Sequence, residues 1–109
     1  MKRRLPPAAK RALEKVGADI EAARKRRRWT EDLMAERVGV TRKTYAKIEA
    51  GDPTVSWGAV AGALFALQMT DRLQDLADVS GDEVGLFAET ERLPQRVRMR
   101  APARKGGGG

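Results

Sequence analysis

The chain has 109 residues and contains neither cysteine nor histidine. A chain of this length forms one domain with tails, because such short chains rarely divide into two packed cores. The two absences exclude a disulfide framework and the usual zinc sites, and they remove the most frequent general base of enzymes. No carboxylate pair lies in an apolar setting that would raise its pKa, so we expect no enzyme and no cofactor.

Charge is separated along the sequence. Residues 1–51 hold fifteen Lys or Arg against seven Asp or Glu, residues 52–91 hold one against eight, and residues 92–109 hold six and no acid. A basic segment that faces a polyanion, with an acidic segment that faces elsewhere, is typical of nucleic-acid binding. For the acidic segment two interpretations stay open, a solvated back of the domain and a docking face for a basic partner.

The N-terminus carries charge but no apolar stretch. Residues 1–10 lack the apolar core of a signal peptide, and no apolar run in the chain approaches the roughly 18 residues that span a bilayer. We therefore expect a cytoplasmic protein without a membrane partner, in which residues 1–10 form a flexible basic arm.

A first helix is predicted to begin at the pair Pro6-Pro7 and to end within the basic run 24–28, where cations suit a helix C-terminus. Its apolar residues recur at spacings of three and four. They are Leu13, Val16, Ile20 and Ala23. Gly17 weakens the middle of this helix, so residues 8–16 are predicted to form a frayed extension.

Three further helix starts share one pattern. Thr30, Thr41 and Ser56 are each good N-caps, because a hydroxyl can accept a hydrogen bond from a free N–H of the first turn. Each is flanked by two apolar residues at the spacing of a hydrophobic staple. The pairs are Trp29 with Met34, Val40 with Tyr45, and Val55 with Val60. The pattern predicts helices at 31–38, 42–50 and 57–67, with Gly39 and Gly51 in the turns that follow the first two.

The remainder of the chain predicts a fifth helix at 71–78, with Leu73, Leu76 and Ala77 facing inward, and a last short helix at 82–92. Residues 96–100 alternate as a strand does, but no second strand in the chain could pair with them. The glycine-rich end after residue 103 is expected to be disordered.

Two short helices joined by a glycine turn form a helix-turn-helix. In the second helix, Tyr45, Ile48 and Ala46 are predicted to meet the core. The polar residues Arg42, Lys43, Thr44 and Lys47 are predicted to face outward. Arg and Lys bind the O6 and N7 acceptors of guanine, and Thr contacts a phosphate or a thymine methyl group. Thr41 and the free N–H groups at the start of the helix also suit a phosphate.

The segment at residues 30–51, TEDLMAERVGVTRKTYAKIEAG, resembles the Xre/Cro-type helix-turn-helix of phage repressors. The resemblance covers roughly residues 17–79, and its specific marks are Ala35, Gly39, Ile48 and the close at Gly51. It implies an all-α, five-helix, lambda-repressor-like fold. It also implies base reading by Arg42, Lys43 and Lys47, backbone contacts near Thr41 and Thr44, and a structural ion pair between Arg24 and Glu49.

The sequence departs from that family at the first residue of helix 31–38. Relatives often have a glutamine that contacts DNA there, whereas this chain has Glu31. A carboxylate suits a helix N-terminus but repels phosphate, so the glutamine contact does not carry over.

Further along, GDPTVS at 51–56, LFAL at 64–67 and DRL at 71–73 are similar to the antitoxin-repressors (HipB-like) that accompany HipA-type kinase toxins. This resemblance implies an autoregulating homodimeric repressor of double-stranded DNA that also binds and neutralises the kinase. The alternative is a stand-alone phage-type or housekeeping Xre-family regulator without a toxin partner. In either case we expect a palindromic operator whose half-sites lie about one helical turn apart.

These expectations define an organisation for the whole chain. The DNA-binding domain is assigned to residues 11–79, a short helical segment for a dimer or partner to 80–93, and a basic tail to 94–109, with a strand that could pair across the dimer. Val84, Leu86, Phe87 and Leu93 are the apolar residues left for the dimer contact.

Three other residues have competing interpretations. Arg28 is predicted to contact a phosphate, although its run could simply complement a helix C-terminus. Trp57 and Phe65 are interpreted as core or dimer interface rather than as a ligand site.

Overall fold

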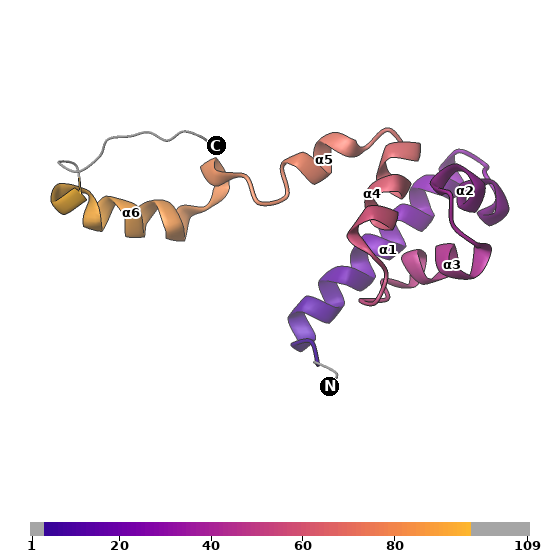
Figure 1. Ribbon diagram of the computed structural model, residues 1–109, viewed down its shortest axis with the longest axis horizontal. Coiled ribbons are helices and arrows are strands. Elements are labelled where there is room, and N and C mark those ends of the chain that lie inside the picture. Colours follow the sequence, from indigo (N-terminus) through magenta and orange to yellow (C-terminus); the bar gives the residue numbers. More distant parts are fainter. Residues whose placement is uncertain (1–3, 97–109) are drawn as a thin grey trace. The chain divides into compact units, whose positions relative to one another are not determined.

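The computed structural model describes residues 4–96, and the side chains of residues 4–92. In that range the chain is all-α, as predicted, with six α-helices, one 3-10 helix and no strand (Figure 1). The helices are α1 Pro7–Arg26, α2 Glu31–Val38, α3 Arg42–Ala50, α4 Trp57–Ala66, α5 Thr70–Gln74, η1 Val79–Gly81 and α6 Glu83–Arg96. None of them has the length and apolar character needed to span a bilayer. The chain divides into two compact units, Met1–Leu73 and Gln74–Gly109.

The N-caps of α2, α3 and α4 are those that the sequence predicted. The hydroxyl of Thr30 accepts a hydrogen bond from the Leu33 N–H at 3.0 Å. Thr41 and Ser56 do the same for the N–H groups three residues on, at 3.1 and 3.0 Å. The predicted bounds of α2 and α3 are confirmed, and α4 ends one residue before its predicted end. The sequence could predict them because each capping hydrogen bond joins residues only three apart.

The core of the first unit lies where α1, α2, α3 and α4 meet. Its buried apolar residues are Ile20, Ala23, Met34, Ala35, Tyr45, Ile48, Ala63 and Leu67. The outer staple residues Trp29, Val40 and Val55 pack against this cluster. Trp57 and Phe65 do not belong to it, because both side chains are about 70 % exposed, at 69 % and 73 %. The core interpretation of these two residues is therefore wrong.

Helix α1 runs without a break through Gly17, so the prediction of a frayed extension at residues 8–16 is wrong. Gly17 is instead a point where two helices approach closely. A Cβ at Gly17 would lie 2.4 Å from the carbonyl oxygen of Glu49, and one at Gly51 would lie 2.5 Å from that of Leu13. The two glycines therefore let α1 and the end of α3 touch backbone to backbone. Residues 7–10 form the first turn of this helix, whose N-terminal end extends past the other helices of the unit (Figure 1). The prediction of a flexible arm therefore does not hold for these four residues.

Four residues at or just beyond helix ends are left-handed, but only two of them are glycine. Gly39 and Gly51 follow α2 and α3 with φ of 84° and 73°, as the sequence predicted. Arg28 and Gln68 follow α1 and α4 with φ of 60° and 62°. These two turns were not predicted, because residues with a Cβ rarely adopt this conformation.

Helix α5 is shorter than predicted and ends at Gln74. Leu76 and Ala77 are exposed rather than inward, so that part of the prediction is wrong. The chain turns instead, because the Asp78 N–H donates to the Asp75 carbonyl and the Asp78 carboxylate accepts from the Ser80 N–H.

Helix α6 confirms the helix expected at 82–92 and extends beyond it. The Asp82 carboxylate accepts a hydrogen bond from the Gly85 N–H at 3.0 Å and so caps its start. Arg96 is the last residue of α6, and the rest of the strand expected at 96–100 lies outside the described residues.

Candidate nucleic-acid interface

Helix α3 presents one apolar face and one polar face. Tyr45 and Ile48 are buried in the core. Arg42, Lys43 and Lys47, the predicted base-reading residues, are exposed, and Thr41 at the start of the helix is also exposed. Lys43 and Lys47 lie roughly opposite the buried residues, whereas Arg42 lies at the flank. Thr44 is half-buried, and its hydroxyl accepts a hydrogen bond from the Thr41 hydroxyl at 3.2 Å. The structure therefore gathers five of the six predicted site residues on or beside one helix.

Ala46 is exposed, and the prediction that it meets the core is wrong. The residue follows Tyr45 by about 100° around the helix, which places it on the outer face with Lys43 and Lys47. A small residue among long cationic ones leaves room for close approach, and an alanine methyl suits the thymine methyl group in the major groove. The helical spacing already indicated an exposed position, because Ala46 lies three residues after Lys43 and one before Lys47.

The angle between α2 and α3 is fixed by the turn at residues 39–41. Gly39 is left-handed, and the Val40 N–H donates to the Ala35 carbonyl at 3.0 Å, which closes the end of α2. Ala35 is buried in the core cluster, to which α2 and α3 both contribute. This turn and its apolar staple hold the outer face of α3 in one orientation.

A buried ion pair anchors the other end of α3. Arg24 Nε lies 2.7 Å from Glu49 Oε2, and both side chains are less than 10 % exposed. A second Arg24 nitrogen, Nη1, donates to the Trp29 carbonyl at 2.9 Å. The structural ion pair that the family resemblance implied is thus present, and it ties α3 to α1.

Two pKa values change around this pair. The hydrogen bond to Glu49 raises the pKa of Arg24, against the opposing effect of burial. Burial raises the pKa of Tyr45, and the hydrogen bond that its hydroxyl donates to Glu49 raises it further. The Glu49 carboxylate therefore accepts hydrogen bonds from a guanidinium and from a neutral phenol, and both stabilise its buried charge.

A second group of charges lies at the start of α3, where Arg42 and Asp32 are exposed. Arg42 Nε donates to Glu31 Oε1 at 3.3 Å, and Arg42 Nη1 lies 3.6 Å from Asp32 Oδ1. The other oxygen of Glu31 faces Arg24 Nη2 at 3.7 Å. The sequence alone did not indicate this group, because its members come from three helices and are brought together only by the turn.

The basic run at the end of α1 has three different environments. Arg24 is buried in the ion pair. Arg27 donates to the carbonyls of Ala23 and Leu67 at 2.7 and 3.1 Å, so it neutralises the C-terminal ends of α1 and α4. Arg28, the sixth predicted site residue, is exposed in its left-handed turn, apart from α3 in sequence and outside the core.

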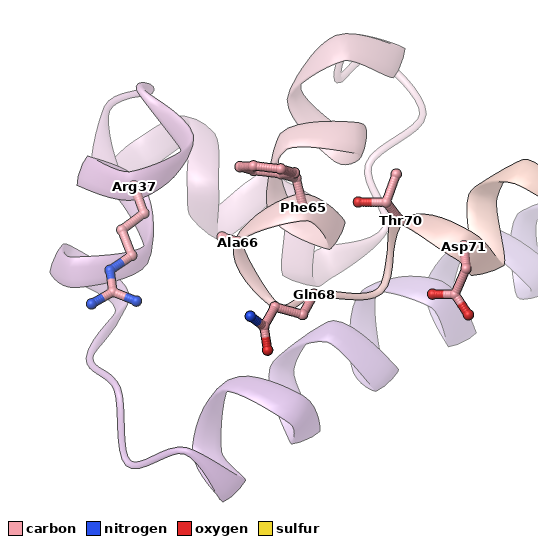
Figure 2. A pocket seen from close by; sticks show the side chains of 6 residues that line it. All are labelled: Arg37, Phe65, Ala66, Gln68, Thr70 and Asp71. Atoms are coloured by element: carbon pink, nitrogen blue, oxygen red, sulfur yellow. The ribbon is translucent and has the colours of Figure 1, made fainter.

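No residue of α3 lines a surface hollow of about 590 Å³ in the first unit. Figure 2 shows Arg37 at one side of it and Thr70 and Asp71 at the other. Phe65, Ala66 and Gln68 complete the lining. The guanidinium of Arg37 also stacks on Trp29, 4.3 Å from the ring centroid, so Trp29 is occupied by α2 and the core rather than free to stack on a base.

A family model described as a helix-turn-helix domain matches residues 15–84. The chain belongs to this family. The match begins within α1 and ends at the start of α6, and the domain is Xre-like, in agreement with the resemblance seen in the sequence. No curated protein and no solved structure matches the chain. A helix-turn-helix domain is the mark of a DNA-binding transcriptional regulator rather than of an enzyme.

Proposed function

We propose that the chain is a sequence-specific repressor that binds double-stranded DNA as a homodimer, with α3 in the major groove. The observation that carries this proposal is the exposed face of α3, which displays three cations and is fixed from behind by the buried pair of Arg24 and Glu49. A rigid polar helix of this kind can align side chains with base edges. The DNA-binding part is residues 11–79.

The exposed residues of α3, Thr41 and Arg28 each have a role in this proposal. Arg42, Lys43 and Lys47 bind base edges, and Ala46 contacts a thymine methyl group. Thr41, Thr44 and Arg28 bind the phosphate backbone and set the register of the helix.

The test is a binding selection followed by substitution. A pool of random duplexes is selected with the full chain, and the dissociation constants of the selected duplex and of a scrambled duplex are then measured. We expect Lys43→Ala to weaken binding to the selected duplex by about ten- to a hundredfold and binding to the scrambled duplex much less.

Lys25→Ala is the matched control, because Lys25 lies on α1 and pairs with Glu21 at 3.0 Å. It removes the same charge without touching α3. Equal losses on both duplexes for Lys43→Ala would contradict base reading, and a pool from which no duplex is enriched would contradict the proposed function as a whole.

The dimer contact is proposed for α6, in the segment 80–93. Val84 and Phe87 are 82 % and 66 % exposed, and none of the residues 74–92 is buried. Exposed apolar side chains on one helix are typical of an interaction surface. In the sequence the acidic residues of 82–91 are followed directly by a basic stretch, so two antiparallel copies would bring opposite charges together.

Light scattering of the purified chain tests this contact. Phe87→Glu should shift the protein from dimer to monomer, whereas Phe65→Glu, at an equally exposed aromatic residue of the first unit, should not. The reverse result would move the interface to α4.

A second function, as the antitoxin of a HipA-like kinase, is favoured by the acidic segment 52–91 and by the motifs at 51–56, 64–67 and 71–73. The acidic face would bind a basic surface of the kinase. Co-expression with a kinase encoded beside the gene tests it. Failure of the two proteins to co-purify would leave the alternative, a stand-alone Xre-family regulator.

A further inference from the structure

Arg42 is the only one of the three exposed cations of α3 that forms an ion pair among residues 4–92. Its side chain is 62 % exposed, yet its Nε is held by Glu31 at 3.3 Å and one terminal nitrogen lies 3.6 Å from Asp32. Both carboxylates belong to the first turn of α2, so they come from a different helix. The cation nearest the start of α3 is therefore neutralised before any DNA is bound.

Glu31 is itself held in position. Its second oxygen faces Arg24 at 3.7 Å, and Arg24 is fixed by Glu49 in the core. A continuous series of charged groups thus runs from the core through Glu31 to the guanidinium of Arg42. A change in the orientation of Arg42 must break at least one contact of this series.

The geometry of the guanidinium decides what Arg42 can bind. Its five N–H donors lie in one plane, and the hydrogen bond to Glu31 uses the Nε donor. Neither terminal nitrogen forms a hydrogen bond within the described residues, although Nη1 lies 3.6 Å from Asp32 Oδ1. Their donors can therefore make the paired hydrogen bonds to guanine O6 and N7. A phosphate would instead have to approach the same cation beside two carboxylates, which repel it.

We infer that Glu31, assisted by Asp32, is a positioning residue that reserves Arg42 for base reading and keeps it off the phosphate backbone. The inference rests on the proposed DNA binding by α3. It assigns specificity to the position where the glutamine of related repressors is absent. Glu31 contacts no DNA in this arrangement and acts through Arg42.

The test compares two substitutions that remove the same charge from α2. Glu31→Gln frees Arg42, whereas Glu36→Gln is the control, because Glu36 is exposed on α2 and pairs with no cation among residues 4–92. Dissociation constants for the selected and the scrambled duplex are measured for the full chain over a series of salt concentrations.

We expect Glu31→Gln to lower the preference for the selected duplex about tenfold, mainly through tighter binding to the scrambled duplex. The slope of log K against log salt should become steeper by about one, because the freed Arg42 now binds a phosphate. Glu36→Gln should change neither the preference nor the slope by a comparable amount. Asp32→Asn, at a more exposed residue, should give a smaller change in the same direction.

The Arg42→Ala background separates positioning from simple charge. There, Glu31→Gln should behave as Glu36→Gln does. The inference is overturned if Glu31→Gln equals Glu36→Gln in the native background, or if Arg42→Ala leaves the preference unchanged. In both cases a loss of specific binding in Lys43→Ala would still support the proposed function, so the two failures are distinguishable.

Discussion

The two ends of α3 carry the same chemistry in opposite environments. At the C-terminal end Glu49 pairs with Arg24 at 2.7 Å, and both side chains are buried. At the N-terminal end Arg42 pairs with Glu31 at 3.3 Å in a position open to solvent. A buried pair is strong only as a whole, since either partner alone would be an unpaired charge in the core. An exposed pair contributes little stability and exchanges readily with a ligand. The difference indicates that one end of α3 is anchored while the other is free to bind.

The largest expected effect comes from breaking the anchored end. Glu49→Ala leaves Arg24 buried without a carboxylate and removes the acceptor of the Tyr45 hydroxyl, so we expect a loss of about 3–5 kcal/mol in the free energy of unfolding. Chemical denaturation at neutral pH measures it. A loss below about 1 kcal/mol would show that this pair behaves as an exposed one, and would contradict the difference between the two ends of α3.

The second prediction separates α1 from the same end of α3. Gly17→Ala places a Cβ 2.4 Å from the Glu49 carbonyl oxygen, so we expect it to destabilise the protein by about 1–3 kcal/mol. Gly58→Ala in α4 is the control, because its nearest atom would be 3.9 Å away. There alanine should stabilise the helix by about 0.5–1 kcal/mol, as it does at ordinary helical positions. Equal signs for the two variants, in thermal denaturation, would contradict the close approach of α1 and α3.

Sequence predictability also differs between the two ends. Thr41, Gly39 and Gly51 act on their own helix and its turn, so the bounds of α2 and α3 followed from local pattern. The pair of Arg24 and Glu49 joins residues 25 apart and was known only through the family resemblance. The pair of Arg42 and Glu31 had no sequence signal, because it depends on the angle at which α3 leaves the turn.

The predictions failed where an apolar pattern had nothing to pack against. Leu76 and Ala77 follow Leu73 by three and four residues, the spacing of one helix face, yet both are exposed beyond the end of α5. A pattern of this kind predicts a buried face only when another element covers it. The left-handed conformation of Arg28 and Gln68 was not predicted for a different reason. A turn that uses a residue with a Cβ has no glycine to mark it in the sequence.

The third prediction concerns pH and again tests the anchored end. Because burial raises the pKa of Tyr45 above its ordinary value of about 10, the folded state favours the neutral phenol. Its contribution to stability is fully present below pH 10 and is lost as pH rises above that value. Tyr45→Phe removes a hydrogen bond to a charged carboxylate and should cost about 1.5 kcal/mol at pH 8.

This difference between the native protein and Tyr45→Phe should shrink at pH 10.5, when the phenol ionises in the unfolded chain. Denaturation curves of both proteins at the two pH values measure it. A difference that stays constant or grows with pH would mean that Tyr45 is not held neutral by its surroundings.

The smallest effect is expected at the N-terminal end of α3. A double-mutant cycle with Arg42→Ala and Glu31→Ala isolates the coupling energy between the two side chains, which should be below about 1 kcal/mol because Arg42 is largely exposed. Half-molar salt should weaken it further, since screening acts strongly on exposed charges. A coupling above about 2 kcal/mol that resists salt would make this pair a second anchor. Arg42 would then have to break a strong contact to reach a base, and the N-terminal end of α3 would no longer differ in kind from the end that Glu49 holds.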